Sequence, residues 1–324
     1  MAIVSGASAE CIEQAAQRLA DGGLVALPTE TVYGLAARAD DDDAVAKIFA
    51  AKGRPVDHPL IVHVRGRDEA LAFADGLSHA AERLIAAFWP GPVTVIVRRA
   101  PGRAGAAAAA APTVALRSPA HPVARAVLER CAQLGVLGVA APSANRFGRV
   151  SPTTAAHVSD EFGPDLLVLD GGPCELGIES AIVDCSSEAP VLLRPGVITR
   201  ERLEEALGTP LREAEAESPR APGTLESHYA PRATLRLMSA SEMKTALQVL
   251  PATIQGLAVY SRTAPRRHPV VQVMPDDPRA VARELFAVLR AFDDRGVKLI
   301  WVEQPPDTPD WEGVNDRLQR AAAH

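Results

Sequence analysis

Residues 24–64 read LVALPTETVYGLAARADDDDAVAKIFAAKGRPVDHPLIVHV, and this stretch decides the fold class. The apolar runs at residues 24–27 and 60–64 are typical of short buried strands. Between them, residues 42–51 predict a helix, because their acidic first turn suits the positive end of the helix dipole and Gly53 can end the helix. Strands that alternate with helices indicate an α/β protein.

The same alternation extends on both sides of this stretch. Before it, Ser8 can cap a helix in which apolar side chains recur at helical spacing from Ile12 to Leu19. After it, helices are predicted at residues 78–89, 121–134 and 199–207, and strands at residues 93–98, 114–117, 137–140, 166–169, 181–184 and 191–194. These elements fill a first domain, which we place at residues 1–208.

Residues 209–232 are expected to form a linker, because they hold four prolines, many charges and no sustained apolar period. Residues 233–324 alternate between strand and helix patterns again and predict a smaller, Rossmann-like parallel α/β domain. Neither GxGxxG nor GxxxxGK[ST] occurs in the sequence, so no nucleotide-binding fingerprint points to this second domain.

Composition excludes several classes of protein. The net charge is −6, which argues against a protein that coats nucleic acid. The four cysteines lie far apart and outside any zinc-binding spacing, as is typical of reduced thiols in a cytosol. There is no signal-peptide pattern and no apolar run of about 18 residues, so we expect a cytoplasmic protein without membrane association.

Lys52-Gly53-Arg54-Pro55 is the first candidate binding motif. A residue before proline favours extended chain, and residues two apart in extended chain share a face. An ammonium and a guanidinium on one face could clamp a polyphosphate. The same two cations could instead complement the negative end of the preceding helix.

Polar residues at the ends of predicted strands form a second group of candidates. Ser143 and Asn145 could bind phosphate or ribose oxygens, or could make a turn. Arg117 and Arg194 emerge from apolar strands and need an anion, which could be a ligand or a carboxylate of the protein. His63 could be a ligand contact or a satisfied histidine of the core.

Four motifs in this order resemble those of the YrdC-like threonylcarbamoyl-AMP synthases. They are the stretch at residues 27–64, APSANRFGRVSPTTAAHV at residues 141–158, GIESAIVDCS at residues 177–186 and LLRPGVIT at residues 192–199. The resemblance implies a twisted mixed sheet with helices for the first domain. With SHYAP at residues 227–231 and the second α/β domain, the chain resembles the long, two-domain form.

Members of that family combine L-threonine, bicarbonate and ATP into threonylcarbamoyl-adenylate and pyrophosphate, for the threonylcarbamoyladenosine modification of tRNA. The resemblance therefore implies a nucleotidyltransferase that uses Mg²⁺ held by the ATP phosphates. It also implies downstream tRNA threonylcarbamoyl-transfer proteins as partners, without a stable complex with nucleic acid. Such a reaction needs no covalent nucleophile, so the protein mainly positions reactants and offsets charge.

The resemblance also implies roles for individual residues. A polar tetrad comprises Lys52, Arg54, Ser143 and Asn145. The positions implied for ATP are Arg54, His58, Thr113, Ser143, Ser151, Arg194 and Tyr229. Those implied for L-threonine are Thr31, His63, Arg117, Ala141 (through its backbone) and Ser180. Tyr229 would fold the linker over the nucleotide as a lid, which would exclude water from labile intermediates.

Three positions depart from the usual pattern of the family: His58 stands for Asn, Phe147 for Ser and Ala181 for Thr. None belongs to the tetrad, so retained activity is expected. At His58, an ATP contact could differ in strength or in pH dependence. Two alternatives remain open. One is a double-stranded RNA-binding module of the same fold without synthase activity, and the other is an inactive paralogue.

Overall fold

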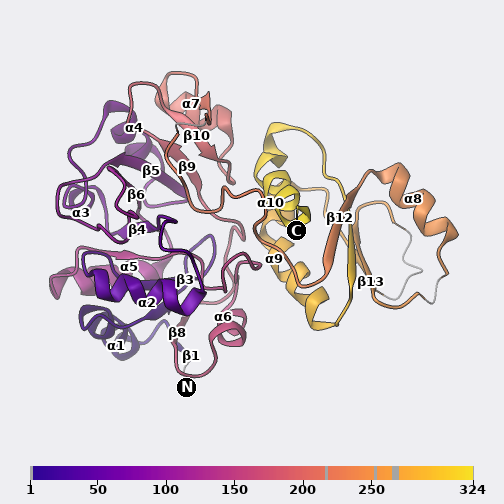
Figure 1. Ribbon diagram of the computed structural model, residues 1–324, viewed down its shortest axis with the longest axis horizontal. Helices are drawn as coiled ribbons and strands as arrows, with labels where there is room; N and C mark the ends of the chain where they lie inside the picture. Colours follow the sequence, from indigo (N-terminus) through magenta and orange to yellow (C-terminus); the bar gives the residue numbers. More distant parts are fainter. Residues whose placement is uncertain (1–2, 216–217, 252–253, 265–269, 324) are drawn as a thin grey trace. The chain divides into compact units, whose positions relative to one another are not determined.

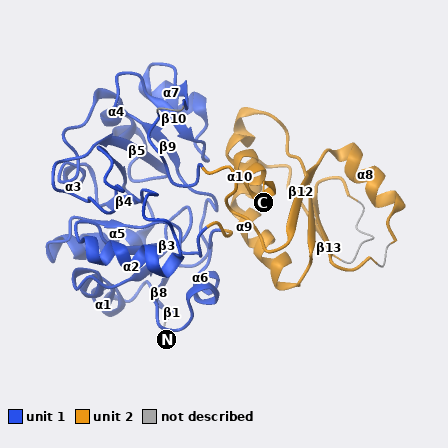
Figure 2. Cartoon of the chain, viewed as in Figure 1, with its two compact units in different colours: residues 1–147, 151–224 blue, residues 148–150, 225–324 orange. Residues whose placement is uncertain are grey.

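The computed structural model describes residues 3–215, 218–251, 254–264 and 270–323. The chain divides into two compact units: unit 1 comprises residues 1–147 and 151–224, and unit 2 comprises residues 148–150 and 225–324 (Figure 2). Each unit is built around one sheet with helices packed against it (Figure 1). Within the described residues, no helix has both the length and the apolar character that crossing a membrane would require.

The sheet of unit 1 has eleven strands in the order β1-β8-β2-β3-β7-β4-β6-β5-β9-β10-β11 and mixes parallel with antiparallel pairs. Its strands are β1 (Ile3–Ser5), β2 (Val25–Leu27), β3 (Gly34–Arg38), β4 (Ile61–Val64), β5 (Val93–Arg98), β6 (Thr113–Arg117), β7 (Gly138–Ala140), β8 (Leu167–Asp170), β9 (Ala181–Asp184), β10 (Val191–Arg194) and β11 (Arg212–Glu213). Its helices are α1 (Ala9–Ala20), α2 (Asp42–Lys52), α3 (Arg67–Ala70), α4 (His79–Phe88), α5 (Pro122–Gln133), α6 (Ala155–Phe162) and α7 (Arg200–Leu207).

Capping residues fix where the helices begin and end. The Ser8 hydroxyl accepts a hydrogen bond from the N–H of Cys11, and the Asp41 carboxylate accepts one from the N–H of Ala44. Gly53 ends α2 in the left-handed conformation, with φ of +62°, which glycine adopts at little cost. The helix therefore stops one residue before Arg54.

The two faces of the unit 1 sheet are covered differently. One face packs on a core that includes buried residues of α2, α4 and α7. On the other face, α1 and α5 cover the end of the sheet that includes β2, β3 and β8. Farther along this second face, strands β4, β6, β5, β9 and β10 carry a small apolar cluster, whose described members come from those strands apart from Ala221. That part of the second face carries the candidate site.

Unit 2 has a parallel sheet of four strands in the order β12-β15-β13-β14. The strands are β12 (Thr234–Met238), β13 (Leu257–Ser261), β14 (Val271–Val273) and β15 (Leu299–Glu303). The helices are α8 (Ala240–Val249), α9 (Pro278–Asp294), the 3₁₀ helix η1 (Pro309–Trp311) and α10 (Glu312–Ala322). Helix α8 lies on one side of the sheet, while α9 and α10 lie on the other (Figure 1).

The predicted fold class is confirmed: a mixed α/β sheet in the first part of the chain and a smaller parallel α/β sheet in the second. Strand β3 is not predicted, because its sequence GLAAR has low β-propensity and forms a strand through pairing with β2 and β7. Helices α6 and α10 are also missed by the sequence pattern. Residues 148–150, which lie inside the predicted first domain, group with unit 2.

Candidate active site

Four polar side chains form a row across neighbouring strands of unit 1. His63 of β4 pairs with Arg117 of β6. The antiparallel register that pairs Val95 with Leu116 places Thr94 of β5 beside Arg117. The hydroxyls of Thr94 and Ser180, the residue that precedes β9, are 2.8 Å apart. Side chains alternate between the faces of a sheet, so this row shares its face with the apolar cluster described above.

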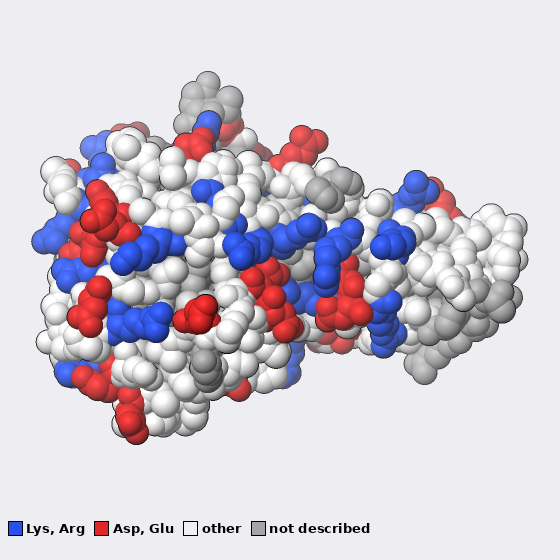
Figure 3. Space-filling view, turned by 60° about the horizontal axis from the view of Figure 1, so that its bottom comes forward, with Lys and Arg blue, Asp and Glu red and all other residues white. Residues whose placement is uncertain are grey.

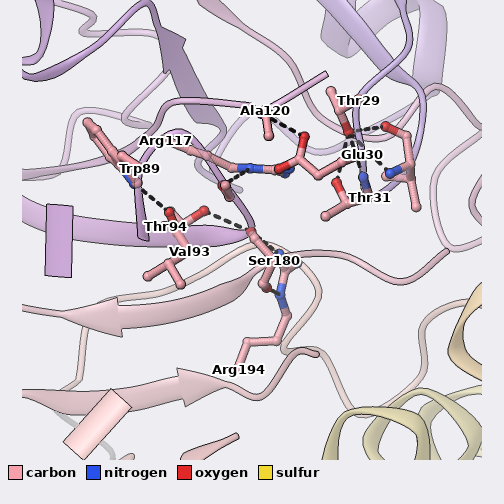
Figure 4. A network of polar contacts seen from close by, with 12 residues as sticks. Thr29, Glu30, Thr31, Trp89, Val93, Thr94, Arg117, Ala120, Ser180 and Arg194 are labelled. Atoms are coloured by element: carbon pink, nitrogen blue, oxygen red, sulfur yellow. Dashed lines mark hydrogen bonds and ion pairs between the residues drawn. The ribbon is translucent and has the colours of Figure 1, made fainter. Parts of the chain in front are cut away.

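Arg117 is held by a carboxylate that the sequence analysis did not single out (Figure 4). Its Nη2 donates to Oε1 of Glu30 over 2.6 Å, and its Nε donates to the carbonyl oxygen of Gly91 over 3.2 Å. The other oxygen of Glu30 accepts from the N–H of Ala120. Burial alone would raise the pKa of Glu30, but the charge and hydrogen bond of Arg117 bring it below its usual value. The two residues are therefore a buried ion pair at the edge of the row.

Thr31 presents an acceptor to the same region. The Thr29 hydroxyl donates to the carbonyl oxygen of Val32 over 2.6 Å, so its proton is used. The hydrogen bond of 2.8 Å between the hydroxyls of Thr29 and Thr31 must then have Thr31 as its donor. What remains on the Thr31 hydroxyl are lone pairs, which suit an ammonium, hydroxyl or amide of a ligand.

His63 is neutral at physiological pH. Burial, and then the nearby charge of Arg117, lower the pKa of His63 to about 3. Its Nδ1 is buried and makes no hydrogen bond to any residue that the structure describes. An imidazole nitrogen of this kind is costly to leave unsatisfied, which fits a ligand partner.

Arg194 joins the row to the predicted linker. Its Nη2 and Nε donate to the hydroxyl and the carbonyl oxygen of Ser180 (Figure 4). Its Nη1 donates to the carbonyl oxygen of Pro222 over 2.8 Å. Next to Pro222, Ala221 packs into the apolar cluster beside the row. This short segment of unit 1 therefore lies over the open face of the sheet.

Lys52 differs from the expected arrangement. It belongs to the last turn of α2 and not to extended chain, because the helix continues up to Gly53. Its buried ammonium donates to the carbonyl oxygens of Ser143 and Asn145, over 2.6 and 2.5 Å. Burial, and then the charge of Arg54, hold the pKa of Lys52 well below its usual value. Three members of the predicted tetrad are thus brought together, with Lys52 binding the backbone of the loop that carries the other two.

Arg54 lies on the other side of Gly53, where its guanidinium donates to the carbonyl oxygens of His58 and Pro59. The ring of Phe147 lies 5.5 Å from the guanidinium carbon, and His58 packs edge-on against the same ring at 5.4 Å. Two of the three departures from the family pattern are therefore in contact with each other. Burial, and then the charge of Arg54, lower the pKa of His58.

The remaining predicted residues have separate surroundings. Ser151 donates to Glu179 over 2.5 Å, and both side chains are buried. Thr113 begins β6, and the N–H of Ala141 is used by the carbonyl oxygen of Ile61. Tyr229 belongs to unit 2, where it stacks on Phe286 with ring centroids 5.4 Å apart.

Three residues of this site were missed from the sequence. Glu30 and Glu179 lie within quoted motifs, but nothing in their spacing tells which cation or hydroxyl each one meets. Thr94 did leave a signal: in VTVIVR it is the single hydroxyl among apolar residues, at a position of the strand that points to the same face as Ile96.

Comparisons with known proteins cover almost the whole chain. The family Sua5_yciO_yrdC, described as "Telomere recombination", matches residues 17–196, and the family described as "Threonylcarbamoyl-AMP synthase, C-terminal domain" matches residues 198–323. The chain is 37% identical to the threonylcarbamoyl-AMP synthase of Bacillus subtilis, over 96% of this chain and 92% of the relative. It is 34% identical to that of Pyrococcus abyssi, over 97% and 94%.

Comparison with solved structures finds similar chains as well. The crystal structure of Pyrococcus abyssi Sua5 complexed with L-threonine matches with a TM-score of 0.87 and 34% identity, over 96% of this chain and 94% of that one. Escherichia coli YciO matches 60% of this chain at 20% identity and a TM-score of 0.51, which concerns the fold alone.

Proposed function

Because this chain belongs to the family of two-domain threonylcarbamoyl-AMP synthases, we propose that it converts L-threonine, bicarbonate and ATP into threonylcarbamoyl-adenylate and pyrophosphate. The chain is a synthase of the nucleotidyltransferase type. The observation that carries this conclusion is the similarity, along nearly all of both chains, to a structure of the same family complexed with L-threonine.

We assign the row of polar side chains to L-threonine. Arg117 uses two of its five N–H donors on Glu30 and Gly91, and its other donors can take the carboxylate of the amino acid. Thr31 offers lone pairs to the amine or the hydroxyl, and the neutral His63 offers a buried nitrogen. Ser180 and the backbone of Ala141 complete this side of the site.

We assign a second group of residues to ATP, namely those that the family resemblance implies. They are Arg54, His58, Thr113, Ser143, Ser151, Arg194 and Tyr229. Within unit 1, Arg54 and Arg194 supply positive charge, and the loop of Ser143 and Asn145 supplies polar groups. Lys52 acts mainly by fixing that loop, since its ammonium is occupied by two carbonyl oxygens. Residues 209–232 act as linker and lid, and their Ala221 already packs beside the row.

ATP chemistry calls for a divalent cation, for which we propose Mg²⁺. Among the described residues, no three His, Cys, Asp or Glu side chains gather at a spacing that would hold a metal ion. In the proposed reaction this ion arrives with the ATP phosphates, since Mg²⁺ commonly keeps several waters and few protein ligands. When bound there, the ion would neutralise charge on the leaving pyrophosphate.

The chemical steps follow from these assignments. Bicarbonate gives CO₂ and hydroxide. The amine of L-threonine adds to the CO₂ carbon and loses a proton, which the hydroxide takes up to form water, and the product is a carbamate. A carbamate oxygen then forms a bond to the α-phosphorus of ATP, and the bond from that phosphorus to the bridging oxygen of pyrophosphate breaks. The cationic side chains offset the negative charge of both reactants, and the proposed lid keeps water from the labile products.

RNA binding as the main activity is not favoured. Acidic and basic side chains are interspersed on the face of the molecule in Figure 3, and the net charge is −6. We propose that the adenylate passes in the cytoplasm to tRNA threonylcarbamoyl-transfer proteins, without a stable complex with nucleic acid.

The assay that tests the function uses the purified full chain with ATP, Mg²⁺, labelled bicarbonate and one amino acid at a time. We expect a labelled adenylate and pyrophosphate with L-threonine, and less product with L-serine. An absence of product with L-threonine would contradict the proposal. RNA affinity that persists with saturating ATP would favour the alternative of an RNA-binding module.

A further inference from the structure

Thr94 occupies the one position of the polar row to which no role has been given. It lies between Arg117 and Ser180 on adjacent strands, and its side chain is fully buried, at 0% exposure. A buried hydroxyl in an apolar strand costs free energy unless it is hydrogen-bonded, and valine would fill the same volume without that cost. The hydroxyl therefore calls for an explanation beyond packing.

The hydrogen bond between Thr94 and Ser180 joins two hydroxyls 2.8 Å apart, and in the described part of the chain it is the one hydrogen bond of the Thr94 hydroxyl. Whichever hydroxyl donates, the proton of the other one is buried without an acceptor among the described residues, so that proton is left for a ligand. Ser180 is the member of this pair that the proposed function assigns to L-threonine, so we take Thr94 as the donor to Ser180.

The donor role of Thr94 decides what Ser180 can do. The hydroxyl oxygen of Ser180 accepts one hydrogen bond from Thr94 and another from Nη2 of Arg194, at 3.2 Å. Both lone pairs are then used, and only the Ser180 proton remains to be donated. Because the side chain is fully buried as well, that proton needs an acceptor on a ligand.

We propose that Thr94 is a positioning residue for L-threonine, which acts by orienting the Ser180 hydroxyl as a donor to the substrate carboxylate. The proposal rests on the proposed function. Arg117, the neighbour of Thr94 in the row, offers its remaining N–H donors to an anion in the same place. A carboxylate accepts from both kinds of donor, whereas an ammonium accepts from neither.

The test is calorimetric binding of L-threonine to the full chain, combined with KM values for L-threonine and for ATP. Thr94→Val removes the hydroxyl and keeps the shape. We expect about fivefold weaker binding of L-threonine, the typical effect of one neutral hydrogen bond, with little change in the KM for ATP. Thr94→Ser keeps the hydroxyl and should restore most of the affinity.

Two controls separate positioning from a general loss of stability. Ser78 lies at the start of α4, a helix on the face of the sheet opposite to Thr94, and its hydroxyl donates to the carbonyl oxygen of Cys185. Ser78→Ala removes this hydroxyl. It should lower stability without changing the affinity for L-threonine. In addition, Thr94→Val and Ser180→Ala should be non-additive when combined, because Thr94 acts through Ser180.

The possible outcomes separate the role of Thr94 from the proposed function. Wild-type affinity in Thr94→Val, an equal rise in both KM values, or additive effects in the double variant would overturn the role of Thr94 and leave the proposed function standing. If the wild-type chain itself does not bind L-threonine, the proposed function fails, and the role of Thr94 fails with it.

Discussion

Lys52 Nζ lies 2.5 Å from the carbonyl oxygen of Asn145, a residue 93 positions farther along the chain. The same ammonium binds the carbonyl oxygen of Ser143. The end of α2 is thereby tied to the loop that follows β7. Lys52 therefore holds the loop in place through hydrogen bonds to its backbone, so its removal should disturb the positions of Ser143 and Asn145 together.

Lys52→Met should lower the rate of synthesis by about 100-fold, since small misplacements of a binding loop have effects of that size. It should also lower the free energy of unfolding by about 1–3 kcal/mol, because two buried carbonyl oxygens lose a charged donor. Pyrophosphate release and urea unfolding measure the two effects. Lys47→Met is the matched control on the same helix, where the ammonium donates to the carbonyl oxygen of Gly22. A rate in Lys52→Met equal to that of the control would contradict the role.

Glu30→Gln should destabilise the protein at neutral pH by about 3 kcal/mol, because it leaves the Arg117 charge buried without a counter-charge. The pKa of Glu30 is lowered in the folded state, so its contribution is present above the usual pKa of a glutamate and is lost as the pH falls below it. Unfolding in urea at neutral and at acidic pH measures the free energy of unfolding of both proteins. The difference in this free energy between wild type and variant should become smaller at acidic pH. Glu13→Gln, at an exposed pair with Arg130, should change stability much less.

His58 should make ATP binding depend on pH. Its pKa is lowered by burial and by the charge of Arg54, with Asp57 opposing and Arg220 adding to that lowering, so the ring is neutral at physiological pH. Below that pKa the protonated ring adds a positive charge beside Arg54. As the pH falls from neutral through the lowered pKa of His58, the KM for ATP should therefore fall more in wild type than in His58→Asn. The ratio of the two KM values cancels the titration of ATP itself, and a ratio that stays constant would refute the effect.

Ala110→Gly should raise the free energy of unfolding by about 0.5–1 kcal/mol. Ala110 has φ of +59°, a conformation that costs an L-residue about 1–2 kcal/mol, part of which is offset by the flexibility of glycine in the unfolded chain. Its side chain is exposed, so no packing is lost. Ala106→Gly in the same loop has no positive φ to relieve and should destabilise. Equal effects of the two substitutions in chemical denaturation would argue against strain at Ala110.

The sequence predicts most helices and strands because their apolar periods and caps are local. The ends of α2 follow from Asp41 and Gly53, and β5 follows from an apolar run that Thr94 alone interrupts before Arg98. It does not predict β3, whose small residues become a strand only between two partners.

For the site too, local features can be predicted from the sequence and long-range ones cannot. The order of strands is set by the whole fold, so a row from His63 to Ser180 across four strands leaves no periodic pattern in the chain. The partner of Arg117 lies 87 residues away, and the local reading of Lys52 as extended chain fails because the helix runs on to Gly53. A polar residue inside an apolar strand, such as Thr94, is the kind of local signal that does survive.

Residues 148–150 have a consequence for anyone who wants to shorten this enzyme. The carbonyl oxygen of Gly148 accepts from the N–H of Ala230, and that of Val150 accepts from Arg290, so this tripeptide is anchored in unit 2 while Phe147 and Ser151 on either side of it belong to unit 1. The polypeptide thus passes between the units at three places, and a single cut after residue 224 would strip the tripeptide of both anchors. A minimal version of the catalytic half would have to be redesigned in the loop next to Asn145 before it could be trimmed.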